Sequence, residues 1–321
     1  MKFFLFPLLI LLGWSHVASC QNEDSLQVVQ RMDEVQNCLK RSQVDSAVML
    51  HNDLLRFCER KSLWIMWLKS HTRIAYYLSN ELNDPRKGVN YLLTGIAKFP
   101  AKPSTETQEQ LSKTYMAVGY IYENSFSDFY SACKQYEKAF EIFVNDLGEH
   151  NDQIAGYIYH KLGNVYTRLG DYERAENMLK RGIAYASKYQ YPNAAKHGDL
   201  ALALIDQRKN EEALRVIQEG IKVNNTGIES KITLKSSESQ AYLNLGNLAA
   251  ARKALAEVLG LINKLSKENS NTDKAYYLAG YYELLAAIEE ADKNVKQANN
   301  CFQKALALEI ESWQTPFRRE V

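Results

Sequence analysis

The chain has 321 residues, of which 46% are hydrophobic and 24% are charged. It holds 20 tyrosines but only 15 glycines and 6 prolines, a composition that favours helices joined by short turns over a sheet protein. Lysine plus arginine number 39 and aspartate plus glutamate number 38, so the overall charge gives no support to a nucleic-acid partner or to an acidic polymer. We therefore expect any binding surface to be local and expect no nucleic acid among the partners.

The N-terminal segment, residues 1–19, has the pattern of a signal peptide. Met1 and Lys2 precede an apolar run over residues 3–12, which is too short to span a bilayer as a mature helix. The end of the segment, Val17-Ala18-Ser19-Cys20, resembles the lipobox of bacterial lipoproteins, in which the cysteine becomes the lipidated first residue of the mature protein.

The lipobox resemblance implies that Cys20 is the lipidation site and that residues 20–24 form the lipidated cysteine and a short polar tether. The protein would then be exported and anchored as a bacterial outer membrane lipoprotein that faces the periplasm or the cell surface. Secretion as a soluble protein is the alternative, because Val17 and Ser19 also suit an ordinary cleavage site with small residues.

From Ser25 onward, apolar residues recur at the three- and four-residue steps of amphipathic helices. The first pair of helices is expected to end near Arg60 and the second near Pro100, where a linker over residues 101–105 follows. The stripe expected to be buried in the first helix consists of Leu26, Val29, Met32, Val35 and Leu39.

The stretch from residue 159 to residue 183, YHKLGNVYTRLGDYERAENMLKRGI, shows the repeated unit most clearly. Its two halves are each amphipathic, and Leu169-Gly170-Asp171 separates them as a turn. Gly163, Ala175 and Gly182 are small where two helices would have to approach closely. The stretch is therefore predicted to be a helical hairpin.

This hairpin resembles the tetratricopeptide repeat (TPR), whose pattern places an aromatic residue, Leu-Gly, Tyr, Ala, an aromatic residue or Leu, and a small residue in this order. One hairpin cannot bury its apolar faces, so several must stack. The resemblance implies an all-α, right-handed superhelical solenoid of about seven TPR-like hairpins over residues 25–312, followed by an extension over residues 313–321. The run from Tyr136 to Ile183 resembles the longer repeats of kinesin light chains.

Two positions depart from the repeat pattern. His197 stands where the fifth copy would have an aromatic residue, and Glu289 occupies the usual tyrosine position of the seventh. Most tyrosines fall at packing positions of the family, which favours a role in the core over one in ligand stacking. They include Tyr115, Tyr122, Tyr136, Tyr159, Tyr166, Tyr242 and Tyr282.

No motif for catalysis or for a cofactor is found along the chain. None of the six histidines is paired with another His or a Glu at the spacing of a helical metal site, and no phosphate-binding loop or nucleophile elbow is found. The cysteines that follow Cys20 lie within apolar helical periodicity, so we expect buried free thiols at Cys38, Cys58, Cys133 and Cys301. We therefore expect a protein that is not an enzyme and has no metal and no cofactor.

In the TPR family, the first helix of each hairpin lines a concave face. By register, the third copy would present Lys113, Met116, Tyr120 and Asn124 there, and the fourth would present Tyr157, His160, Asn164 and Arg168. These polar, cationic and aromatic side chains suit an extended peptide with some acidic character.

Two classes of function fit this organisation. The first is a membrane-anchored, non-catalytic adaptor or scaffold that binds a protein or peptide partner through the concave face of the solenoid. The second is the sensing or regulatory portion of a larger enzyme, such as a caspase-like peptidase, whose catalytic domain would follow Val321.

Overall fold

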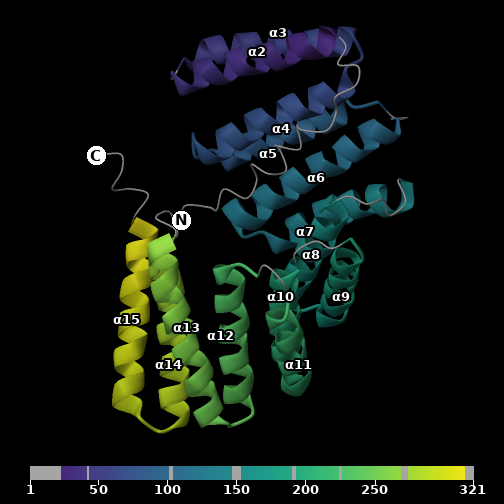
Figure 1. Ribbon diagram of the computed structural model, residues 1–321. Helices are drawn as coiled ribbons and strands as arrows, with labels where there is room; N and C mark the ends of the chain where they lie inside the picture. The colour runs from purple at the N-terminus through teal and green to yellow at the C-terminus, as the bar shows by residue number, and fades with distance from the viewer. Residues whose placement is uncertain are drawn as a thin grey trace. The chain divides into compact units, whose positions relative to one another are not determined.

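The computed structural model describes residues 23–41, 43–100, 104–146, 153–189, 193–223, 226–268 and 274–314. Within these ranges the chain forms fourteen α-helices and one π-helical segment, and no strand (Figure 1). Cys20 and the extension after Gln314 lie outside the described residues. None of the described helices is long and apolar enough to cross a membrane.

Successive helices pair into hairpins, and the chain divides into two compact units at Val165 and Tyr166. The N-terminal unit contains six helices, the π-helical segment and most of α8: α2 (Glu23–Lys40), α3 (Val44–Arg60), α4 (Trp64–Asn80), α5 (Pro85–Ala97), α6 (Thr105–Phe126), α7 (Phe129–Glu141), η2 (Ile142–Asp146) and α8 (Gln153–Arg168).

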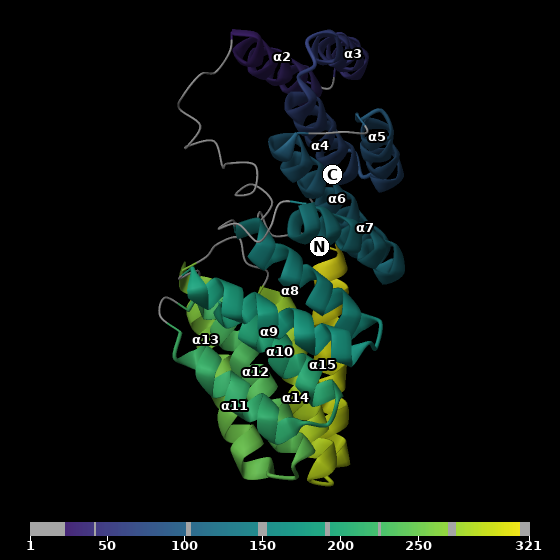
Figure 2. The same cartoon turned by 90° about the vertical axis from the view of Figure 1, so that its right-hand side faces the viewer.

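The C-terminal unit begins with the last three residues of α8. Its helices α12 to α15 lie side by side (Figures 1 and 2). The elements of this unit are α9 (Tyr172–Lys188), α10 (Ala194–Asp206), α11 (Asn210–Ile221), α12 (Ile228–Asn244), α13 (Leu248–Glu268), α14 (Lys274–Ala291) and α15 (Val295–Gln314). The predicted all-α architecture of paired TPR-like hairpins is therefore confirmed.

Several helix starts follow from side chains that cap the first turn. Asp84 accepts a hydrogen bond from the backbone N–H of Lys87 at 3.1 Å, and Pro85 opens α5 where no backbone donor is needed. Asp171 caps α9 in the same way, and the preceding Gly170 has a φ of 77°, which favours glycine. The predicted turn at Leu169-Gly170-Asp171 is thus confirmed.

The first helix is rotated relative to the stripe expected from the sequence. Met32, Val35 and Leu39 are buried as predicted, but Leu26 is 46% exposed and Val28 is completely buried in its place. Val28 and Met32 pack with residues of α3 and α4, so the contacts with the neighbouring helices select the buried side. The expectation that Leu26 is buried was wrong, because the periodic pattern is compatible with burial of either Leu26 or Val28.

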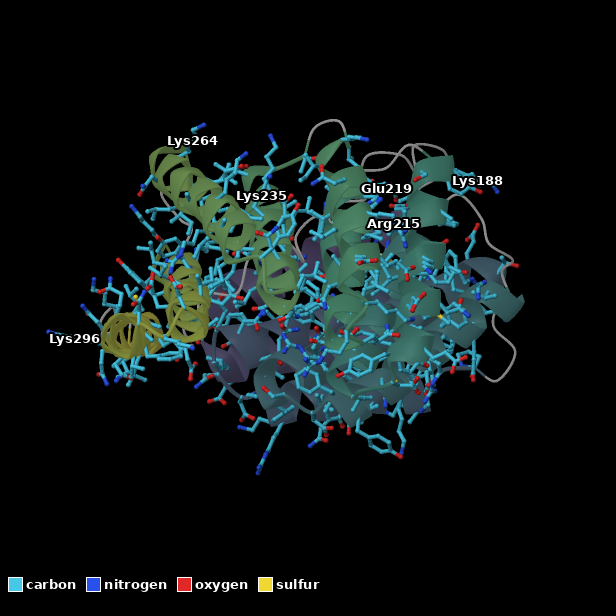
Figure 3. The ribbon with its side chains drawn as sticks, turned by 90° about the horizontal axis from the view of Figure 1, so that it is seen from below. Lys188, Arg215, Glu219, Lys235, Lys264 and Lys296 are labelled. Carbon is cyan, nitrogen blue, oxygen red and sulfur yellow. The ribbon has the colours of Figure 1, made fainter. Side chains whose placement is uncertain are left out.

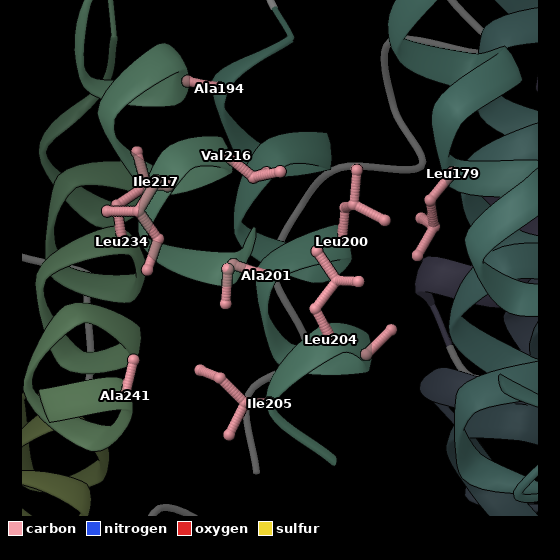
Figure 4. Packing of buried hydrophobic residues seen from close by; sticks show 12 residues of the cluster. Leu179, Ala194, Leu200, Ala201, Leu204, Ile205, Val216, Ile217, Leu234 and Ala241 are labelled. Atoms are coloured by element: carbon pink, nitrogen blue, oxygen red, sulfur yellow. The ribbon is translucent and has the colours of Figure 1, made fainter. Parts of the chain in front are cut away.

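One core cluster of the C-terminal unit consists of aliphatic side chains from successive helices (Figure 4). Leu179 comes from α9, Leu200 and Leu204 from α10, Ile217 from α11 and Leu234 from α12. Each is at most 3% exposed, and full burial of a side chain of this size stabilises the fold by roughly 1.5–3 kcal/mol.

The two departures from the repeat pattern have structural explanations within the C-terminal unit. His197 of α10 is buried against Gly220 of α11. A Cβ added to Gly220 would lie only 2.7 Å from the Cβ of His197, so α10 and α11 can approach this closely only because residue 220 is a glycine. Glu289 accepts hydrogen bonds from Arg252 of the preceding hairpin and from Asn294, the latter at 2.9 Å. A charge pair between hairpins thus replaces the usual tyrosine.

Candidate functional site

Six of the seven candidate residues lie on α6 and α8 in the N-terminal unit. Each is partly buried: Lys113, Tyr120 and Asn124 on α6, and Tyr157, His160 and Asn164 on α8. Arg168 is exposed and belongs to the C-terminal unit, where it lowers the pKa of Asp206 against the larger effect of burial, which raises that pKa. Met116 is only 6% exposed, so the expectation that it faces a ligand was wrong.

Three tyrosines from three successive first helices form a cluster that we call the tyrosine face: Tyr76 on α4, Tyr120 on α6 and Tyr157 on α8. The rings of Tyr76 and Tyr120 meet edge to face, with centroids 6.1 Å apart. Lys161 lies over two of the rings, with its Nζ 5.5 Å from the centroid of Tyr120 and 5.7 Å from that of Tyr157. The face therefore combines aromatic surface with a cation held close to it.

The tyrosine hydroxyls of this face remain protonated near neutral pH. Burial raises the pKa of Tyr157, and the nearby Glu123 and Tyr120 raise it further. The pKa of Tyr76 is raised by burial and then by Tyr157 and Tyr120. Within the described residues, none of the three hydroxyls makes a hydrogen bond, so the face offers three neutral O–H groups to a ligand.

The ion pair of Lys161 with Glu123, beside the tyrosine face, is satisfied within the protein. The Nζ of Lys161 lies 3.1 and 3.0 Å from the two carboxylate oxygens of Glu123, and the Tyr136 hydroxyl donates to Glu123 at 2.6 Å. The Lys161 and Glu123 side chains are only 13% and 17% exposed. This network connects α6, α7 and α8, and it neutralises Lys161.

Two other polar side chains of α6 have partners on the same helix. The amide of Asn124 donates to the backbone carbonyl of Tyr120 at 2.9 Å, and Lys113 pairs with Glu109 one turn earlier. His160 and Asn164 follow Tyr157 by about one and two turns on α8. Burial lowers the pKa of Lys69 on α4, and the charge of Lys113 adds to that effect while Glu109 opposes it.

The sequence prediction missed Tyr76, Glu123, Lys161 and Lys69. Two of them, Lys69 and Tyr76, could have been predicted from a repeated spacing in the sequence. Lys69, Tyr76 and Asn80 on α4 recur as Lys113, Tyr120 and Asn124 on α6, each 44 residues later. The same register on two first helices that pack together marks a shared surface. Glu123 and Lys161 have no such signal, because their pairing depends on the contact between helices.

The C-terminal unit has a shallow pocket of about 350 Å³ between α9, α10 and α11. Figure 3 labels Arg215 and Glu219 of α11, which both line it. Lys180, another lining residue, is already paired with Glu176 at 2.6 Å and with Glu212 at 3.4 Å. The lining mixes both signs of charge with apolar groups, so it selects no particular ligand chemistry.

Two of the four thiols in the described residues are less acidic than an ordinary cysteine. Burial raises the pKa of Cys58 to about 12 and also raises that of Cys301. Cys133 is buried, Cys38 is partly buried, and all four are free, as predicted. In the described part of the chain, no group of three or more His, Cys, Asp or Glu side chains could hold a metal ion.

Comparison with known proteins identifies the repeat. Residues 110–188 match the model of the tetratricopeptide repeat family. This part of the chain therefore contains tetratricopeptide repeats. No curated protein matches the chain.

Solved structures share the fold of this chain at low identity. The apo form of RapI is 13% identical with a TM-score of 0.63, and the match covers 90% of this chain and 99% of RapI. A Rap protein complexed with competence and sporulation factor is 15% identical with a TM-score of 0.55, covering 91% of this chain and 80% of the other. The TPR-like repeats of a putative kinesin light chain from Podosopora anserina are 16% identical with a TM-score of 0.51, covering 63% and 97%.

Proposed function

We propose that the protein is a membrane-anchored, non-catalytic adaptor or scaffold that binds a protein or peptide segment on the tyrosine face. One observation carries the proposal: three partly buried tyrosines from α4, α6 and α8 have hydroxyls that make no hydrogen bond within the described residues, although the neighbouring ion pair of Lys161 and Glu123 is satisfied. Partly buried donors of this kind gain most when a ligand supplies acceptors.

An extended peptide suits the tyrosine face for two physical reasons. Its backbone carbonyls recur every few ångströms and can accept from hydroxyls on successive helices. Tyrosine side chains also bury a large apolar area with little loss of conformational freedom, which makes them frequent hot spots at interfaces. The solved complex of a Rap protein with competence and sporulation factor is a similar fold with a bound ligand, which supports this role.

Removing the hydroxyls tests the proposal. We expect Tyr120→Ala to weaken binding of the partner captured from membrane extracts about thirtyfold, because a true hot spot contributes about 2 kcal/mol, and Tyr157→Phe to weaken it about fivefold, because one hydrogen bond contributes about 1 kcal/mol. Quantitative mass spectrometry compares the proteins captured by each variant. The matched control is Tyr130→Ala on α7, which removes a tyrosine that is 62% exposed and lies outside the tyrosine face. Equal losses for all three variants, or none for the first two, would contradict the proposal.

The membrane anchor is proposed to be the lipidated Cys20, on the outer membrane of a bacterium. A processed lipoprotein with two or three acyl chains binds a bilayer stably without a transmembrane helix. Globomycin, which blocks the lipoprotein signal peptidase, should leave an unprocessed precursor, and Cys20→Ala should release soluble protein. Normal processing in the presence of globomycin would instead favour plain secretion.

A further inference from the structure

The cations on the partly buried side of α4, α6 and α8 differ in whether a carboxylate neutralises them. Arg73 pairs with Asp33 of α2 at 3.2 Å, Lys113 pairs with Glu109, and Lys161 pairs with Glu123. Lys69 also lies on this side of α4, one turn before Arg73 and two turns before Tyr76. Within the described residues it makes no ion pair and no hydrogen bond through its side chain.

The environment of Lys69 is unfavourable for an isolated ammonium group. The side chain is partly buried, and burial and then the charge of Lys113 lower its pKa, an effect that the charge of Glu109 offsets only in part. A second carboxylate, bound at Lys69, would add to the effect of Glu109, because it supplies hydrogen-bond acceptors and the opposite charge. The repeated order of Lys69 and Tyr76 on α4, and of Lys113 and Tyr120 on α6, puts this cationic pair at one edge of the tyrosine face.

We infer that Lys69 binds an acidic side chain of an extended partner segment that continues across the tyrosine face. This inference rests on the proposed function and specifies the chemistry of the partner. A side chain fits better than a chain terminus, since Arg73, one turn after Lys69, is already paired with Asp33 of α2 and adds no second unpaired cation to hold a terminal carboxylate.

A display library of random twelve-residue peptides, selected on the purified protein, tests the inference. We expect the enriched peptides to contain Asp or Glu more often than the starting library. Lys69→Gln should weaken binding of the best synthetic peptide about tenfold, since a hydrogen bond to a charged group contributes about 1.5–3 kcal/mol. Lys69→Glu should shift the selection toward Lys and Arg. Lys134→Gln on α7, which removes an exposed lysine from the same unit, should leave both results unchanged.

The outcomes separate this inference from the proposed function. If peptides bind and depend on Tyr157 but show no acidic preference, the inference is overturned and the proposed function stands. If no peptide is enriched, or if Tyr157→Phe and Tyr120→Ala bind normally, both are overturned. Each selected peptide is also made with a free or an amidated C-terminus, and dependence on the free terminus instead of Asp or Glu would contradict a side-chain contact. Lys69→Gln should unfold at or above the wild-type temperature, which excludes misfolding as the cause of its weaker binding.

Discussion

At the scale of single residues, close packing is most demanding where Gly119 of α6 meets Tyr136 of α7. A Cβ added to Gly119 would lie 2.5 and 2.6 Å from two ring carbons of Tyr136. Tyr136 has no exposed surface, and its hydroxyl is held by Glu123, so the ring has little room to move. The small residue of the repeat pattern is therefore required here by contact with a specific aromatic ring.

We predict that Gly119→Ala lowers the free energy of unfolding by about 2 kcal/mol, because the added methyl group forces the Tyr136 ring or the helices apart. Gly260→Ala is the matched control in the interior of α13. A Cβ there meets no atom within 4 Å, so alanine should stabilise the protein by about 0.5–1 kcal/mol through its greater helix propensity. Urea titrations measure both changes, and a loss of stability of similar size in the two variants would contradict the packing argument.

At the scale of secondary-structure elements, the pair of Glu123 and Lys161 connects α6 to α8 across 38 residues of chain. Tyr136 of α7 joins the same carboxylate, so three consecutive helices share one polar network. A partly buried network of this kind has a double effect. When complete, the network stabilises the fold about as much as apolar side chains of similar size would. When one partner is lost, the other charge remains partly buried without compensation, which destabilises the fold.

We predict that Lys161→Met lowers the free energy of unfolding by about 2 kcal/mol, since Glu123 would remain partly buried without its cation. The double variant Lys161→Met with Glu123→Gln should regain most of that loss, because the neutral amide still accepts from Tyr136. A double-mutant cycle by urea unfolding gives the coupling between the two residues. Additive losses would show that the pair is not coupled. Lys87→Met, which disrupts an exposed pair with Asp84, should change stability little.

At the scale of the whole molecule, two buried histidines make stability depend on pH. His51 on α3 and His71 on α4 have ring centroids 6.0 Å apart, and both contact Tyr91. The Nε2 of His51 is buried with no hydrogen-bond partner. Burial lowers the pKa of His51 to about 3, with a further contribution from His71, and lowers the pKa of His71 to about 4. Both rings are neutral in the folded protein near pH 7.

We predict that the protein loses stability as the pH falls from 7 to 5. The unfolded histidines take up protons near pH 6.5 while the folded ones do not, so the unfolded state is favoured increasingly below that value. Each histidine contributes about 1.4 kcal/mol per pH unit below 6.5, or about 2 kcal/mol at pH 5. Urea unfolding followed by the fluorescence of Trp67, which contacts His71, measures the change. His51→Leu should reduce the pH dependence by about half, and an unchanged slope would contradict a role for His51.

The sequence by itself determined the features that depend on neighbouring residues. The three- and four-residue periodicity specified helical hairpins, and Gly170 with Asp171 specified a turn and the helix start after it, because these effects act within a few residues of chain. The register of the repeat also placed Tyr120 and Tyr157 on first helices, where the structure has them in one cluster.

Only the tertiary structure decided which side chains meet across helices. It selected Val28 instead of Leu26 for the core, and it paired Lys161 with Glu123 and Arg252 with Glu289. It also left Lys69 without such a partner among the described residues. These outcomes depend on how packed helices are rotated and how far apart they lie, because charge pairing and burial change over a few ångströms. Periodicity in the sequence predicts which side of a helix is apolar, but it does not decide which of two nearby apolar residues is buried.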